Sequence, residues 1–150
     1  MKYLDDLVFD IFPEAEAWKI AEEKAKEYLK EYEKAKPLLS SEFLAEYEKS
    51  YFHDYEIQTF RPVKTSGTEY NFELALKKDG RIVTVIYHSV DRLKIDVKID
   101  STLRMFDILD SEILPAGGGK LSHEFTVSSS EGGSMHIICK SITAEITSDK

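Results

Sequence analysis

The spacing of the hydrophobic residues changes once along this chain, near residue 52, and this change most limits the folds open to it. Before that point, apolar residues recur every three or four positions, as on one face of a helix. After it, apolar and polar residues alternate, as they do in half-buried strands. A helical segment followed by a run of strands predicts an α+β fold.

Two helices are predicted in the first third of the chain. The first covers residues 13–36, with Pro13 in its first turn and Pro37 just after its end. Its predicted apolar stripe consists of Trp18, Ala21, Ala25, Tyr28, Leu29, Tyr32 and Ala35. The second helix is shorter, and Ser40 or Ser41 can cap it. Its predicted buried side consists of Phe43, Leu44, Tyr47 and Tyr51.

The remaining residues predict a mostly antiparallel, curved sheet of about six or seven strands. Asp79-Gly80 is a hairpin signal, because both residues tolerate a positive φ. Residues 62–67 are expected to form a loop, whereas 105–114, 121–127 and 134–146 are expected to be strands. A length of 150 residues fits one domain, 1–150, in which a helical region (1–51) docks on a β region (52–147).

The charge of the chain restricts its partners. There are 20 Lys and Arg residues against 28 Asp and Glu, a net charge of −8, which argues against nucleic acid and is compatible with a basic protein partner. No apolar run is long enough for a membrane-spanning helix. Asp5, Asp6 and Asp10 lie where a signal peptide would be apolar, and Cys139 is the only cysteine. We therefore expect a cytoplasmic protein.

Histidines and their acidic neighbours are the candidate site residues. The His53-Asp54 pair, followed by Tyr55, sits between the helical and the β region, and His88 and His123-Glu124 lie on predicted strands. If these side chains converged, they could form a metal or acid–base site. The alternative is that each histidine is structural, because no HExxH spacing is present and neighbouring strand residues point to opposite faces. We expect no cofactor and assign no catalytic residue.

Other possible motifs fail on their spacing. Gly117-Gly118-Gly119-Lys120 lacks the upstream glycine and the following Ser or Thr of a phosphate-binding loop, so a hairpin turn is expected. Cys139 lies in an apolar run that is typical of a buried, unreactive thiol. Six tyrosines between residues 28 and 70 are interpreted as the boundary between the helices and the sheet.

Four short segments resemble a group of bacterial domains of unknown function. They are residues 52–57 (FHDYEI), 86–90 (IYHSV), 110–113 (DSEI), and 123–125 (HEF) with Gly132-Gly133 and Ile142 after them. The resemblance covers residues 52–146, but the segment before Asp110 lacks the expected tryptophan, and residues 128–134 are richer in Ser and Gly. It implies no particular activity. Small acidic α+β domains of this size also occur among bacterial immunity proteins, which is an analogy of size and charge.

Three functions follow as hypotheses. The first is a small cytosolic binding protein, in its most concrete form an immunity-like inhibitor of a basic partner. The second is a metal-dependent hydrolase with a His/Asp/Glu cluster. The third is a curved sheet that binds a small ligand between Tyr70, Phe72, Tyr87 and Phe125. Both a monomer and a homodimer remain open, since a second copy could cover an unpaired edge strand.

Overall fold

Two N-terminal helices are present, as predicted, in the computed structural model, which describes residues 1–3 and 11–148. Helix α2 (Glu14–Ala35) follows Pro13, and a short 3-10 turn, η1 (Lys36–Leu38), leads to α3 (Ser41–Tyr47). Ser40 caps α3, since its hydroxyl accepts a hydrogen bond from the backbone N–H of Phe43 (3.1 Å). Asp5, Asp6 and Asp10 lie outside the described residues.

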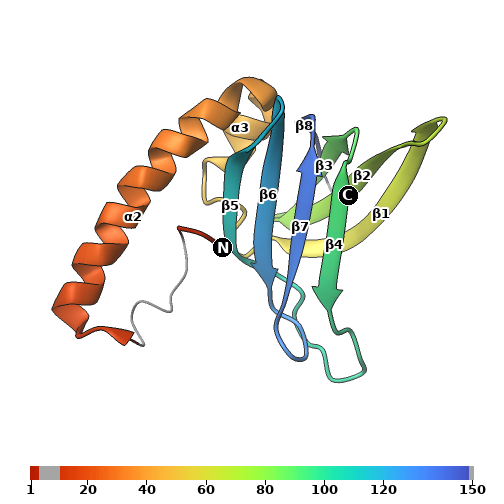
Figure 1. Cartoon of the computed structure of the whole chain (residues 1–150). Helices are drawn as coiled ribbons and strands as arrows, with labels where there is room; N and C mark the ends of the chain where they lie inside the picture. Colours follow the sequence, from red (N-terminus) through yellow and green to blue (C-terminus); the bar gives the residue numbers. More distant parts are fainter. Residues whose placement is uncertain (4–10, 149–150) are drawn as a thin grey trace.

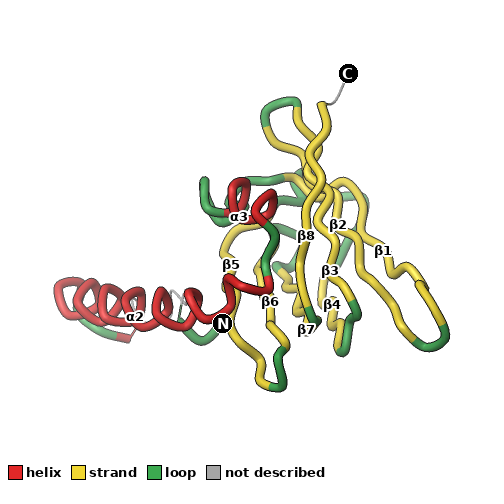
Figure 2. The backbone as a smooth tube through the Cα atoms, turned by 90° about the horizontal axis from the view of Figure 1, so that it is seen from above, coloured by secondary structure: helices red, strands yellow, loops and turns green. Residues whose placement is uncertain are grey.

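In the described part of the chain, eight antiparallel strands form two four-stranded sheets (Figures 1 and 2). The first has the order β1-β2-β3-β8 and consists of β1 (Glu56–Ser66), β2 (Glu69–Lys78), β3 (Arg81–His88) and β8 (Ser141–Ser148). The second has the order β4-β7-β6-β5 and consists of β4 (Arg92–Val97), β7 (Gly133–Cys139), β6 (Lys120–Val127) and β5 (Ile108–Gly117). The α+β class and the antiparallel pairing are thus confirmed. No helix among the described residues is both long and apolar enough to cross a membrane.

The two sheets are continuous at a corner. Strand β3 leads into β4, and β7 leads into β8, so one bent pair of strands belongs to both sheets. At the bend, Lys140 N–H donates to the carbonyl of His88 (3.0 Å), and Asp91 N–H donates to that of Ile138 (2.8 Å). The predicted single strand 134–146 is therefore two strands, which accounts for the larger strand number.

One hydrophobic core lies between the sheets and extends under the helices. Its members come from both sheets, from α3 and from the C-terminal half of α2. Helix α3 packs against β8, and α2 packs against β5. An antiparallel bridge between Glu56 and Asp107 joins the start of β1 to the segment before β5. The boundary tyrosines Tyr28, Tyr32, Tyr47 and Tyr55 are buried as interpreted, whereas Tyr51 and Tyr70 are exposed.

The predicted apolar stripe of α2 is wrong at two positions. Trp18 is 62% exposed, and Leu29 is also exposed. The buried residues of α2 are Ala17, Tyr28, Tyr32 and Ala35, and the last three of these belong to the predicted stripe. Trp18 is exposed because α2 reaches beyond the sheets at its N-terminal end (Figure 1). Leu29 is exposed because it lies about 100° around the helix from the buried Tyr28, away from β5.

Two turn predictions have opposite outcomes. The Asp79-Gly80 hairpin is confirmed, and both residues have a positive φ (49° and 74°). The loop expected at residues 62–67 is wrong, because β1 continues through Pro62 to Ser66 and pairs with β2. Proline is tolerated there because β1 is an edge strand. The strand predicted from residue 105 begins only at Ile108.

Candidate functional site

The candidate histidines do not converge. His53 is exposed in the turn before β1, and its Nδ1 lies 2.7 Å from the carbonyl oxygen of Leu109. His88 is half-buried on β3, with Nε2 2.7 Å from the hydroxyl of Thr143. His123 is fully buried on β6. Among the described residues, no three His, Cys, Asp or Glu side chains are grouped so that they could hold a metal ion. The metal-dependent hydrolase therefore finds no support.

His53 and Asp54 are held outward by a strained turn. Tyr51, Phe52 and Asp54 all have a positive φ (54°, 61° and 64°), which is rare for residues other than glycine. Phe52 anchors the turn, since it is fully buried and its ring packs on those of Tyr47 and Tyr55 (centroids 5.0 Å apart in both pairs). Strain of this kind persists only where surrounding packing enforces it, and it is frequent at functional positions.

His123 belongs to a buried chain of hydrogen bonds that the sequence did not reveal. Its Nε2 lies 2.6 Å from Ser111 Oγ, which in turn lies 2.8 Å from the hydroxyl of Tyr47. Its Nδ1 lies 2.8 Å from the hydroxyl of Tyr87. Tyr47 also bonds to the hydroxyl of Tyr28, so the chain connects both helices with both sheets. Hydroxyl groups donate and accept, so every member of the chain can be satisfied.

The ionisation of this chain follows from its burial. Burial lowers the pKa of His123 to about 3, with a smaller contribution from His136, so the ring is neutral near pH 7. Burial also raises the pKa of Tyr47 and of Tyr87 well above the ordinary value, so both keep their protons. A serine beside a histidine can act as a nucleophile with its base. Here Ser111 and His123 are both sealed in the core, and the third partner is a tyrosine, so the arrangement is structural.

Tyr55 belongs to a second buried polar group, which fastens α3 to the sheet. The carboxylate of Glu46, 1% exposed, accepts hydrogen bonds from the Tyr55 hydroxyl (2.7 Å) and from Arg81 Nη2 (2.5 Å), and it pairs with Lys49 (2.9 Å). Burial favours the protonated acid, but the bonds from Tyr55, Lys49 and Arg81 outweigh it and lower the pKa of Glu46. The sequence of α3 places Glu46 next to the buried Tyr47, which could have marked it as a carboxylate near the core. Its partner Arg81 could not be found in this way, because it is distant in the sequence.

Glu124 lies on the outer face of β6, opposite in direction to His123, as the alternation of strand side chains requires. Its Oε1 lies 3.0 Å from the amino group of Met1. Glu112, the residue opposite Glu124 on β5, accepts hydrogen bonds from the backbone N–H groups of Lys2 and Tyr3 (3.1 and 3.0 Å). These two carboxylates hold residues 1–3 against the sheet.

Carboxylates are crowded where β1 meets β5. We call the residues Asp54, Glu56 and Asp107 the acidic seam. Glu56 and Asp107 are opposite each other in the antiparallel bridge, and Asp54 N–H donates to the carbonyl of Ile108 (2.9 Å). Burial, followed by the charges of Glu56 and Asp54, raises the pKa of Asp107, while Lys78 acts in the other direction. Lys77 is opposite Glu56 in the register of β1 and β2, and His53 Nε2 lies 3.5 Å from Asp54 Oδ1, so positive groups border the seam. Like charges meet directly only where Asp107 is opposite Glu56.

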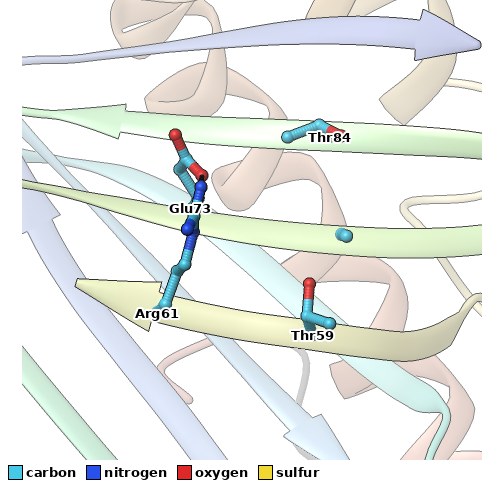
Figure 3. A pocket seen from close by; sticks show the side chains of 5 residues that line it. Thr59, Arg61, Glu73 and Thr84 are labelled. Atoms are coloured by element: carbon cyan, nitrogen blue, oxygen red, sulfur yellow. Dashed lines mark hydrogen bonds and ion pairs between the residues drawn. The ribbon is translucent and has the colours of Figure 1, made fainter. Parts of the chain in front are cut away.

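A shallow hollow of about 320 Å³ lies on the outer face of the first sheet, lined by Thr59, Arg61, Glu73, Ala75 and Thr84 (Figure 3). Thr59 and Thr84 lie opposite Ala75 in neighbouring strands. Arg61 closes one side, because its Nε and Nη2 donate to the same oxygen of Glu73 (3.0 and 2.9 Å). The two charges in the hollow thus neutralise each other.

The aromatic pocket suggested for a small ligand is filled by its own side chains. Phe72 and Tyr87 are fully buried with ring centroids 5.8 Å apart, and Phe125 is packed against His123 (5.1 Å). Tyr70 lies outside the core and is exposed. Of the residues proposed for a site, His53 and Asp54 are therefore presented to solvent together, and His88 and Glu124 lie on other surfaces.

The comparisons with known proteins do not assign a family. The chain matches no family model, no curated protein and no solved structure.

Proposed function

We propose that this protein is a small binding protein whose acidic seam docks a basic protein partner. The observation that carries the proposal is the position of Asp107 opposite Glu56 and beside Asp54, where burial and then the charges of these two carboxylates raise the pKa of Asp107. Like charges placed opposite one another destabilise a fold, and they persist where binding requires them. A cationic side chain from a partner would relieve this repulsion.

The acidic face expected on the first helix supports docking less well. Within α2, seven glutamates are interleaved with five lysines. Glu31 is paired with Lys34 (2.8 Å), and Glu33 is paired with Lys36 (2.9 Å). In contrast, the acidic seam lies beside a turn that is fixed by the buried Phe52, so its charges are held in place before a partner arrives.

An immunity-like role, in which the seam blocks a basic toxin, is the most concrete form of this proposal. Complementary charge speeds the encounter of two proteins and makes their association sensitive to salt. We therefore expect a complex that forms rapidly at low ionic strength and that weakens as salt screens the seam.

The test is a pull-down from the lysate of the cell of origin, at low and at high salt, with mass spectrometry of the retained proteins. The bait is the wild type, the seam variant Asp54→Asn/Glu56→Gln/Asp107→Asn, or the control Glu16→Gln/Glu23→Gln/Glu27→Gln on α2. Both variants lose the same charge. At low salt, we expect the wild type and the control to retain one stoichiometric basic protein. High salt should release this protein, and the seam variant should fail to retain it.

Two results would contradict the proposal. One is a wild-type bait that retains no basic protein. The other is a basic protein that the seam variant holds as well as the control does. Denaturant unfolding of the three proteins shows whether the seam variant is folded, and we expect it to be more stable than the wild type because its mutual repulsion is gone.

A further inference from the structure

Among the residues that the structure describes, the second sheet has one covered edge and one edge without a strand partner. The β5 edge is covered by α2 and by the turn before β1: Ile113 N–H donates to the hydroxyl of Tyr28 (3.1 Å), and Ile108 N–H donates to the carbonyl of Tyr55 (2.9 Å). At the other edge, the only strand paired with β4 among the described residues is β7 (Figure 1). Such an edge is a template for another strand.

Strand β4 presents two different faces along this edge. Leu93 and Ile95 are opposite the core residues Ile137 and Met135, so Leu93, Ile95 and Val97 face the core side of the sheet. Ile95 is nevertheless 36% exposed, because no described strand lies beyond β4 to cover it. Lys94 and Asp96 point to the outer face and are exposed.

We propose that two copies of this chain associate through their β4 strands, antiparallel, about a twofold axis at Ile95. A twofold interface requires a surface that is complementary to itself. Residues 93–97 (LKIDV) meet this requirement, since the twofold places Leu93 opposite Val97 of the second copy and Ile95 opposite its equivalent. On the outer face, Lys94 comes opposite Asp96 of the second copy, and Asp96 opposite Lys94.

The charges of β4 select this register over its neighbours. A shift of the twofold to Lys94 would bring two lysines directly opposite each other, and a shift to Asp96 would bring two aspartates opposite each other and Lys94 opposite Lys98. A twofold placed between two residues would bring apolar residues opposite charged ones. Beyond the five central residues, Lys98 would approach Arg92 of the second copy. Lys98 is already paired with Glu131 (2.7 Å) and lies 3.9 Å from Asp100, which reduces that repulsion.

The association would join two four-stranded sheets into one continuous eight-stranded sheet. The apolar residues of both copies would lie on the same side, and each copy would extend the apolar surface over the exposed Ile95 of the other. A contact made by one pair of strands is small by the standard of permanent dimers, so we expect dissociation in the micromolar range. The acidic seam lies at the opposite edge of this sheet and stays accessible.

Charge reversal tests the interface without a partner from outside. In the Lys94→Asp variant, carboxylates face carboxylates across the twofold, and in Asp96→Lys ammonium groups face ammonium groups. We expect each variant alone to dissociate about tenfold more readily than the wild type in sedimentation velocity experiments. An equimolar mixture of the two variants should form heterodimers, and the double variant Lys94→Asp/Asp96→Lys should dimerise like the wild type.

The matched controls are Lys30→Asp and Glu23→Lys, which make the same charge changes at exposed positions of α2. They should leave the dimer unchanged. Circular dichroism of each single variant verifies the fold, and the mixture reports directly on pairing between two folded proteins. A wild type that is monomeric at about 0.5 mM, above the expected micromolar range, would overturn the proposal, as would single variants that dimerise like the wild type or a mixture that forms no heterodimer.

Discussion

At the scale of single residues, one of the candidate histidines, His123, is a structural member of the core. His123 uses both ring nitrogens inside the core, one toward Ser111 and one toward Tyr87. A neutral imidazole can hydrogen-bond to both hydroxyl partners. An imidazolium would be a buried charge, and neither of its hydrogen-bond partners carries the opposite charge. Protonation of His123 is therefore coupled to the stability of the whole fold.

This coupling predicts a loss of stability in mild acid. The pKa of His123 is about 3 in the folded chain against an ordinary 6.5, so between these values the unfolded chain binds the additional proton. The contribution of His123 to the free energy of unfolding should be fully present above about pH 6.5. Below that pH, the free energy of unfolding should fall by up to ~1.4 kcal/mol per pH unit. Urea unfolding from pH 7 to about pH 5, above the range of ordinary carboxylates, measures this slope.

His123→Gln supplies the control for that measurement. The variant should be less stable at pH 7, because Ser111 and Tyr87 lose their partner. Its free energy of unfolding should also depend less steeply on pH, because the contribution of His123 is gone. Equal slopes in the variant and the wild type would show that other groups cause the acid sensitivity.

A second prediction at this scale concerns the Glu46–Arg81 pair. Arg81→Met removes the bidentate partner of a buried carboxylate, and it should destabilise the fold by about 2 kcal/mol, less than for a fully buried pair because Arg81 reaches solvent. The double variant Glu46→Gln/Arg81→Met should be more stable than the sum of the two single changes implies. Denaturant unfolding of the four proteins measures the coupling, and additive effects would refute it.

At the scale of elements, helix α2 acts as the cover of an edge strand. Its contact with β5 is both apolar and polar, since the hydroxyl of the buried Tyr28 accepts the backbone N–H of Ile113. Tyr28→Phe keeps the ring but leaves this N–H without an acceptor, which should cost about 1–3 kcal/mol. Unfolding in urea measures this cost, with Tyr70→Phe at an exposed position as control. An equal effect of the two changes would contradict the role of the hydroxyl.

The contact between β7 and β4 leads to a prediction for Gly133. A Cβ atom at this position would lie 2.6 Å from the backbone oxygen of Asp96, so any side chain must displace β4. Gly133→Ala should therefore destabilise the protein by about 1–3 kcal/mol. The neighbouring Ser134→Ala, which keeps the backbone contact, is the control in the same unfolding experiment. A tolerated alanine would mean that β4 is not held closely against β7.

At the scale of the whole molecule, the core should make the chain unfold as one unit. Residues of α2, of α3 and of both sheets belong to the same hydrophobic cluster, and the bent strands leave no separate half. We expect far-UV circular dichroism, which follows helices and strands, and near-UV circular dichroism, which follows tyrosine packing, to show one coincident transition. Two separated transitions would show that the helical region (1–51) and the β region (52–147) are independent.

The candidate site shows where sequence reasoning ends. The position of the His53-Asp54 pair between helix and strand could be predicted, whereas the strained turn that exposes both side chains could not. The acidic seam could not, since Glu56 and Asp107 are far apart in the chain and meet only through one bridge. The buried partners of His123 were likewise beyond reach, because Ser111 and Tyr87 come from different sheets.

Local spacing and backbone preference were enough to define the helical and β regions, the antiparallel class and the Asp79-Gly80 hairpin. Contacts between distant segments, in contrast, determine which face of α2 is buried, where the strands bend, and which edge of the second sheet is covered. The physical reason is that local periodicity limits which residues can be buried, but it does not specify the surface that buries them.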